Sequence, residues 1–303
     1  MVKIVLIFAI YNKLEYTKKG LAGIYNCFDA KGTDIIPLDI VITDDGSTDG
    51  SYEWIQTNYP NIHLIKGDGT LWWSGGINKA IQFVLENLDN NYVLLWNNDI
   101  RPEKVYFSHL FQILENNNPD TIVCSKIYIE NQEDVVLSLG GTFNSRTGRY
   151  DLNGYGEKDN ALLNKSFLAD WFPGMGTCIQ KDIFSVIGFF DEINFPQYHG
   201  DSDFGLRAVK AGYKIIAYPN LKIWNDRSNT GYGNNESLST FFKSLFTLKS
   251  NFNILRDIRF YNRHTNNILA YRFLVKKYFY HIGGYIKWSF LDLFGIKRKE
   301  TKT

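Results

Sequence analysis

The sequence predicts an α/β fold built on a doubly wound, mostly parallel sheet. Three features indicate this: short apolar runs, amphipathic segments between them, and enough residues for a large core. Nearly continuous apolar runs are typical of parallel strands that helices cover on both faces. With 303 residues, 44% of them apolar, we expect one large domain with an appendage.

Strand and helix signals alternate regularly up to about residue 130. Apolar runs predict the strands, and segments with apolar residues at helical spacing predict the helices between them. The expected strands are 2–10, 38–45, 62–67, 92–99 and 121–129. The expected helices are 14–28, 49–59, 77–88 and 103–117.

Beyond residue 135 the helical alternation stops. Residues 135–180 consist of extended pieces with glycine turns, which predict hairpins. A helix at 200–212 and a strand at 213–219 then close the body. Ligands of such a sheet bind beyond the carboxyl ends of its strands, so the loops after the second, third and fourth strands are the first candidates for a site.

The segment GDGTLWWSGGINKA follows the third expected strand. Neighbouring side chains of a strand face opposite ways, so Trp72 and Trp73 cannot both enter one core from a regular strand. Gly75 and Gly76 permit a positive φ or a close approach to a ligand, and a helix beginning near Ile77 would direct free N–H groups there. We expect a ligand-facing turn; the alternative is a tight strand-to-helix connection capped by the tryptophans.

Carboxylates stand at the ends of two of the expected strands. Asp44 and Asp45 end the second strand, directly after the run IVIT, and Asp99 ends the fourth. An acid at the end of a buried strand can bind a ribose hydroxyl, a base N–H or a metal ion. The alternative is helix capping, which we prefer for Asp49 and Ser51.

Two further acids, Asp201 and Asp203, begin the expected helix at 200–212. The helix dipole stabilises a carboxylate in the first turn, so capping alone explains them. Asp201 is also the candidate for a general base, because a glycine precedes it and a helix holds it. Asp203, two residues further along the helix, faces away from Asp201, so we expect it to support the fold. It is also a candidate contact for the acceptor.

Five segments together resemble family 2 glycosyltransferases of the GT-A fold. They are IFAIYNKLEY, TDDGSTDGS, LLWNNDIRP, FPGMGTCIQKDIFSVIGFFDE and HGDSDFGLRAVKAGY, in family order and spacing across about residues 2 to 225. The SGG segment is similar to that of some rhamnosyl- and galactofuranosyltransferase-like members. The resemblance implies a GT-A catalytic domain at 1–240 and a helical carboxy-terminal extension at 241–303.

The resemblance also implies a role for each matching residue. The nucleotide-sugar donor would contact Ala9, Tyr11, Asp44, Asp45, Trp73, Ser74, Gly75, Gly76, Asn78, Asn97 and Asn98. Asp99 would bind Mg²⁺ or Mn²⁺, and Asp201 would be the catalytic base of an inverting transfer. Trp171 and Asp203 would face the acceptor, with a core position as the alternative for Trp171.

The chain departs from the family pattern in two places that concern the metal. The motif reads NND instead of carrying two acids, and Asn225 stands where many members place a histidine ligand. Asp226 can substitute for that histidine, or the ion can rest on Asp99 and the diphosphate alone.

Residues 241–303 differ in charge from the rest of the chain. They carry 13 Lys and Arg against three Asp and Glu, together with 15 aromatic residues, whereas residues 1–240 carry an excess of acids. This composition predicts an amphipathic helical surface for anionic lipid headgroups. The alternatives are a cap on the catalytic body or an interface in a homo-oligomer; we expect no nucleic-acid binding.

Targeting signals and cysteines indicate a cytoplasmic protein. The apolar run at 2–10 lacks the features of a signal peptide, and no run reaches the length of a membrane-spanning helix. Cys27, Cys124 and Cys178 form no CxxC pair. We expect a cytoplasmic enzyme, peripheral on the inner face of the plasma membrane if the extension binds lipid.

These features together predict an inverting, metal-dependent glycosyltransferase. It would move a sugar from a nucleotide-diphosphate sugar to a glycan or lipid-linked acceptor in surface polysaccharide synthesis. The alternatives are a nucleotidyltransferase and a non-catalytic glycan-binding protein on a degenerate transferase fold.

Overall fold

The computed structural model describes residues 2–227 and 238–294. The chain divides into two compact units. The first, here called the body, comprises Met1–Thr142 and Asp151–Glu236, and the second, here called the tail unit, comprises Phe143–Tyr150 and Ser237–Thr303. The catalytic-domain boundary at residue 240 stays a prediction, and the structure adds a short hairpin segment to the tail unit.

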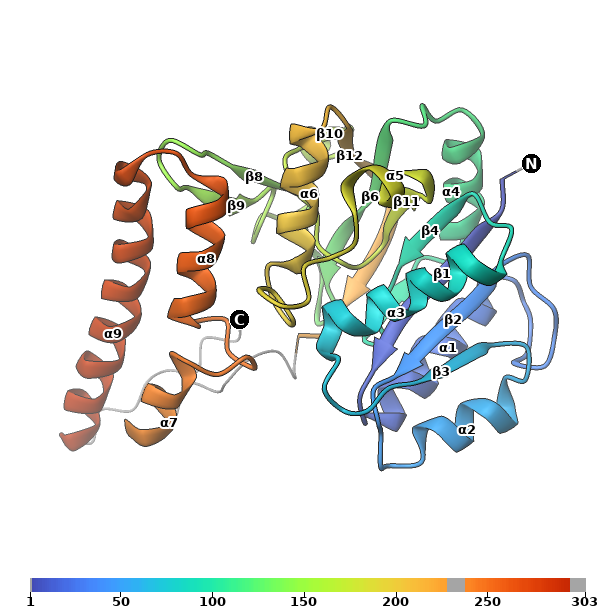
Figure 1. The fold of residues 1–303 in the computed structure, drawn as a ribbon, viewed down its shortest axis with the longest axis horizontal. Helices are drawn as coiled ribbons and strands as arrows, with labels where there is room; N and C mark the ends of the chain where they lie inside the picture. Colours follow the sequence, from blue (N-terminus) through green and yellow to red (C-terminus); the bar gives the residue numbers. More distant parts are fainter. Residues whose placement is uncertain (1, 228–237, 295–303) are drawn as a thin grey trace. The chain divides into compact units, whose positions relative to one another are not determined.

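The body is built on a mixed sheet with the strand order β10-β12-β6-β11-β4-β1-β2-β3, with β5 on β12 and β7 on β6 (Figure 1). Its strands are β1 (Ile4–Ile10), β2 (Asp39–Asp44), β3 (His63–Lys66), β4 (Tyr92–Leu95), β5 (Ile100–Pro102), β6 (Thr121–Ile129), β7 (Gln132–Ser138), β10 (Phe167–Ala169), β11 (Thr177–Gln180) and β12 (Lys214–Asn225). The neighbours β4, β1, β2 and β3 run parallel, and β11 inserts antiparallel between β4 and β6. The α/β prediction is confirmed.

Helices cover both faces of this sheet. The helices of the body are α1 (Leu14–Asn26), α2 (Ser51–Asn58), α3 (Trp72–Asn87), α4 (Tyr106–Glu115), α5 (Asp182–Ile187) and α6 (Gly200–Lys210), with a short 3-10 turn at Ala161–Leu163. Alternation along β1 explains the two layers: Ile4, Leu6 and Phe8 pack with α1 and α4, whereas Val5 and Ile7 pack with α3, α5 and α6. The short helix α5 was not expected from the sequence.

The last strand of the sheet is longer than the sequence indicated. β12 runs to Asn225, with a register irregularity between Tyr218 and Lys222. Beyond that irregularity, Asn225 pairs with Ile100 of the short antiparallel strand β5. This pairing brings the end of β12 to the segment that follows β4, which determines the surroundings of Asp99.

The tail unit consists of helices and the tip of a hairpin. Its elements are α7 (Leu238–Ser244), α8 (Ile254–His264), a 3-10 turn (Ile268–Ala270) and α9 (Tyr271–Leu293), and the hairpin is formed by β8 (Gly141–Phe143) and β9 (Tyr150–Leu152). The Tyr261 hydroxyl donates a hydrogen bond to the Gly148 carbonyl at 2.6 Å, which ties α8 to the hairpin tip. Among the described residues, no helix has both the length and the apolar character needed to cross a membrane.

Candidate active site

The carboxyl ends of β1 and β2 lie side by side. Parallel register pairs Ala9 with Thr43 and Ile10 with Asp44, so the segments after both strands begin at one edge of the sheet. Tyr11 follows Ile10 directly, and its side chain is 56% exposed. An exposed aromatic ring at this edge is available to a ligand, and the donor-binding role of Tyr11 stays a prediction.

Asp44 and Asp45 are both buried but differ in their partners. Asp44 accepts a hydrogen bond from the Ser47 backbone at 2.7 Å through Oδ1, and among the described residues its buried Oδ2 has no donor. Asp45 accepts from the backbone of Gly69 at 2.9 Å and of Trp72 at 3.0 Å. Asp45 therefore holds the loop and the first residue of α3, whereas Asp44 retains an oxygen for a ligand.

The glycine pair lies inside a helix and not in a ligand-facing turn. Helix α3 begins at Trp72, earlier than expected, and the positive φ of 57° belongs to Trp72 itself. A Cβ at Gly76 would lie 2.6 Å from the Cβ of Ala9, so glycine is needed for α3 to pack on β1. The expectation of a turn with a helix beginning near Ile77 is corrected: the close approach is to the chain's own backbone and side chains.

Two polar residues of α3 hold a neighbouring loop. The Ser74 hydroxyl donates to the Phe195 carbonyl at 2.6 Å, and Asn78 exchanges hydrogen bonds with the backbone of Phe190 at 2.9 and 3.0 Å. Asn78 also donates to Glu192 at 2.7 Å. These side chains position the loop before α6, and their donor-binding role stays a prediction.

Trp73 connects the end of β4 with the start of α6. Its Nε1 donates to Asn97 Oδ1 at 3.2 Å, and a Cβ at Gly174 would lie 2.2 Å from its ring. The backbone N–H of Gly174 in turn donates to Asp201 Oδ2 at 2.9 Å. An unbroken path of contacts therefore links Asn97, Trp73, Gly174 and Asp201. The sequence analysis did not identify Gly174 as a site residue. Only its position in the FPGMG loop could have indicated that another side chain packs closely against it.

Asp201 is partly exposed in the first turn of α6. Besides the Gly174 bond, its Oδ1 accepts from the Ser202 backbone at 2.8 Å and the Ser202 hydroxyl at 3.2 Å. Burial raises the pKa of this carboxyl, although these hydrogen bonds oppose the change. The arrangement gives an oriented carboxylate with increased proton affinity.

Asp203 and Trp171 are both buried in the body. Asp203 accepts a hydrogen bond from Arg207 Nε at 2.8 Å, and its side chain is fully covered. The Trp171 Nε1 donates to the Thr142 carbonyl at 3.3 Å, with its ring against Gly141. These contacts support the structural alternatives for both residues, so we do not carry either of them into the acceptor site.

Asp99 lies beside the end of β12. The Asp226 backbone N–H donates to the Asp99 carbonyl at 3.0 Å, and among the described residues the buried Oδ1 of Asp99 has no partner. Burial, with a contribution from the charge of Asp226, raises the pKa of Asp99 to about 6, while hydrogen bonds that the carboxylate accepts from its own backbone N–H and from the Asn225 side chain oppose this. The neighbouring Asn98 instead donates to Thr17 at 3.0 Å and holds α1.

These surroundings fit a divalent cation. Mg²⁺ and Mn²⁺ bind hard oxygen ligands. Three groups here carry such oxygens: the Asp99 carboxylate, whose buried Oδ1 has no donor among the described residues, the Asp226 carboxylate and the Asn225 side-chain amide. Within residues 2–227 and 238–294 no cluster of three His, Cys, Asp or Glu side chains forms a complete metal site. Protein side chains would therefore supply only part of the coordination.

Comparison with known proteins identifies relatives at low identity. A low-salt glycan biosynthesis hexosyltransferase, Agl10, of Haloferax volcanii is 24% identical over 190 residues, which are 58% of this chain and 55% of that protein. An N-acetylglucosaminyl-diphospho-decaprenol L-rhamnosyltransferase of Mycobacterium tuberculosis is 21% identical over 231 residues, 69% of this chain and 74% of the relative. The chain thus spans little more than half the length of the first.

Solved structures show the same fold. The structure of GalNAc-T7 with UDP, GalNAc and Mn²⁺ aligns with a TM-score of 0.56 at 8% identity, covering 75% of this chain and 44% of that one. The S. aureus TarS 1-349 complex with UDP-GlcNAc aligns with a TM-score of 0.51 at 14% identity, covering 79% of this chain and 61% of the other. The predicted GT-A fold is confirmed. Residues 6–172, more than half of the chain, match Glycosyl transferase family 2, and the protein therefore belongs to this family.

Proposed function

We propose that the protein is a glycosyltransferase that uses a nucleotide-diphosphate sugar and inverts the anomeric configuration. The observation that carries this proposal is the pair of acids in contrasting surroundings. Asp99 has a buried oxygen without a donor, whereas Asp201 is oriented by two backbone N–H groups. The contacts through Trp73 connect the segments that carry these acids. One acid suits a cation, and the other suits proton transfer.

Asp99 would hold Mg²⁺ or Mn²⁺ with help from Asp226 and Asn225. A bound cation would offset the negative charge that develops on the leaving diphosphate. Asp44 would accept a hydrogen bond from the nucleoside through its partnerless Oδ2. The exposed ring of Tyr11 would provide an apolar contact beside it.

Asp201 would act as the general base. The acceptor hydroxyl loses its proton to the carboxylate while its oxygen attacks the anomeric carbon, and the bond to the diphosphate breaks on the opposite face. Asp201 Oδ1 already accepts two hydrogen bonds from Ser202, whereas Oδ2 accepts one, from the Gly174 N–H, and keeps a second lone pair for that proton. The raised pKa increases the proton affinity of the base.

The relatives support the substrate classes in this proposal. Two aligned structures contain UDP or UDP-GlcNAc, and the mycobacterial relative is named for a diphospho-decaprenol acceptor. We therefore propose a glycan or lipid-linked acceptor in surface polysaccharide synthesis, with UDP, dTDP and GDP sugars as donor candidates. An acceptor of this kind would place a cytoplasmic enzyme at the inner face of the plasma membrane.

Nucleotide-dependent stabilisation tests the proposal. UDP, dTDP and GDP are added with Mn²⁺ or with EDTA, and the melting temperature is measured, because a ligand of the folded form raises stability by RT ln(1 + [L]/Kd). We expect one nucleotide to stabilise the parent chain with Mn²⁺ but not with EDTA. Asp99→Ala should abolish the effect, and Asp134→Asn, which changes an exposed acid of β7, should retain it.

Product release then separates catalysis from binding. The parent chain should release the nucleoside diphosphate from the matching sugar donor, and Asp201→Asn should bind the nucleotide but release it much more slowly. Stabilisation without release from any donor would favour a glycan-binding protein. Equal stabilisation in EDTA and in Mn²⁺ would contradict the metal role of Asp99.

A further inference from the structure

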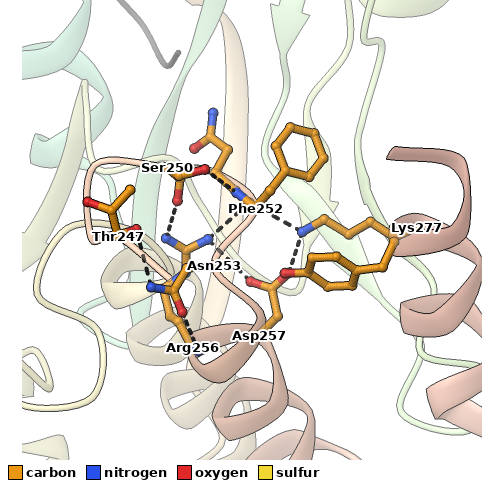
Figure 2. Close-up of polar contacts among 9 residues, drawn as sticks. Thr247, Ser250, Phe252, Asn253, Arg256, Asp257 and Lys277 are labelled. Carbon is orange, nitrogen blue, oxygen red and sulfur yellow. Dashed lines mark hydrogen bonds and ion pairs between the residues drawn. The ribbon is translucent and has the colours of Figure 1, made fainter. Parts of the chain in front are cut away.

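The tail unit buries charged side chains in its interior. Arg256 and Asp257 of α8 are only 3% and 1% exposed, although charged residues are seldom buried so completely. Figure 2 shows Asp257 between the side chains of Arg256 and Lys277. This buried polar network determines which residues of the tail unit are left to face outward.

The network fixes α9 against α8. The Arg256 guanidinium donates to the carbonyls of Ser250 at 2.8 Å and Asn251 at 3.0 Å and to Asp257 at 3.2 Å. From α9, Lys277 donates to Asp257. The adjacent Tyr278 hydroxyl donates to the same carboxylate at 3.0 Å. Because Lys277 and Tyr278 are held by Asp257, they set the rotation of α9 about its axis and therefore which face of the helix is turned away from α8.

The outer face of α9 carries an apolar stripe. Val275, Phe279, Ile286 and Phe290 are 58% to 74% exposed. With 3.6 residues per turn, their spacing places all four within an arc of about 60°. We call these four residues the α9 stripe. It is a row of large apolar side chains that the tail unit leaves exposed, although other apolar side chains of the same helix, such as Leu274, are buried.

Basic residues border one side of the α9 stripe. Arg272, Lys276 and Lys287 are exposed and follow the stripe within about a quarter turn. Asp292 is the only acid in the sequence of α9, and residues 241–303 carry 13 Lys and Arg against three Asp and Glu. An apolar stripe beside basic residues is complementary to a surface with acyl chains beneath anionic headgroups.

We propose that α9 lies in the surface of a bilayer that contains anionic lipids. The α9 stripe would enter the boundary between headgroups and acyl chains, while Arg272, Lys276 and Lys287 would lie among the lipid phosphates. No described helix spans a membrane, so the association is interfacial. This proposal does not rest on the transferase activity and is tested without a sugar substrate.

Vesicle co-sedimentation of the full chain tests this proposal. Vesicles of phosphatidylcholine alone are compared with vesicles containing about one third phosphatidylglycerol, at low and high NaCl. We expect binding to the anionic vesicles at low salt and a large loss at high salt, because exposed charges are screened. Lys276→Gln and Lys287→Gln should each weaken binding about fivefold, the effect of one basic residue near such a surface.

Matched variants separate the stripe from general surface effects. Phe279→Ser with Ile286→Ser should weaken vesicle binding at least tenfold, whereas Ile35→Ser, at a body residue that is 92% exposed, should not change it. Circular dichroism confirms that each variant is folded, and nucleotide-dependent stabilisation should be unaltered in all of them.

Two results would overturn the proposal. Vesicle binding that is absent, or that is equal in the stripe variants and the parent, removes the lipid partner. A dimer in light scattering without vesicles, lost in the Phe279→Ser and Ile286→Ser variant, would assign the α9 stripe to a second copy of the chain. Failure of nucleotide binding with vesicle binding intact would contradict only the proposed function.

Discussion

Replacing Asp99 by asparagine should stabilise the folded chain at neutral pH. Burial raises the pKa of Asp99 from 3.8 to about 6, so the folded protein binds this proton more tightly than the unfolded chain does. The contribution of Asp99 to stability therefore falls as the pH rises from about 4 through 6. An asparagine does not titrate and removes this dependence while keeping the shape of the side chain.

The magnitude follows from the two pKa values. With a pKa of 3.8 in the unfolded chain and about 6 in the folded one, ionisation of Asp99 lowers the free energy of unfolding by about 1 kcal/mol at pH 4.5 and by up to about 3 kcal/mol at pH 8. The stability difference between Asp99→Asn and the parent should thus increase by about 2 kcal/mol across this range. Comparing Asp99→Asn with the parent chain at the same pH removes the contributions of all other titrating groups, because both proteins share them.

Urea unfolding in EDTA at pH 4.5 and pH 8 measures this difference. Asp49→Asn is the matched control, for which no pH dependence is expected in this range. Burial would raise the pKa of Asp49, but hydrogen bonds from Ser51 and from the Leu14 backbone outweigh it and leave the pKa lowered. Because a lowered pKa changes stability only as the pH falls to 3.8 and below, Asp49→Asn should alter stability by nearly the same amount at pH 4.5 and pH 8.

An Asp99→Asn variant that changes stability equally at both pH values, or destabilises the chain more at pH 8, would contradict a raised pKa at Asp99. In that case the carboxylate has donors that compensate for its burial. A stabilised Asp99→Asn variant that no longer binds nucleotide with Mn²⁺ would show that the acid is kept for a ligand at a cost in stability.

Four further substitutions test the site and its supports. Asp201→Asn should retain nucleotide-dependent stabilisation but lose at least about 10² in turnover, as general base catalysis requires, and near-normal turnover would exclude the role. Gly76→Ala should lower the free energy of unfolding by about 1–3 kcal/mol, because its Cβ would lie 2.6 Å from that of Ala9. Gly283→Ala, in a helix where no described atom outside the helix's own nearby backbone lies within 4 Å of the added Cβ, should stabilise by about 0.5–1 kcal/mol, and equal effects of the two alanines would contradict the packing argument. Asp203→Asn should cost about 3 kcal/mol in urea unfolding by breaking a buried ion pair, and a neutral result would return this residue to the acceptor side.

Local patterns in the sequence were sufficient for the main elements of the body. Apolar runs predicted β1, β2, β4 and β6 because a strand covered on both faces has no water-facing side, and nearly every residue of such a run reflects that requirement; β3, the partly buried edge strand, was predicted from a shorter run. The acids at strand ends and at the start of α6 were found the same way, since a strand end or a helix start is a local feature. The family resemblance was confirmed by the match over residues 6–172.

Contacts between distant residues decided the rest. The start of α3 at Trp72 depends on a hydrogen bond to Asp45, which lies 27 residues earlier, and Gly76 is required by its packing on Ala9. Neither condition leaves a pattern within the helix itself, so the glycine pair resembled a ligand-facing turn.

The sequence by itself determined which residue types stand at strand ends and that residues 241–303 are basic and aromatic. Only the tertiary structure decided that the end of β12 brings Asn225 and Asp226 to Asp99, and that Asp203 is covered. Likewise, the partners of Asp257 decide which face of α9 is turned outward. Burial and proton affinity depend on what surrounds a side chain in space, and the chain supplies those surroundings from positions that no local spacing connects.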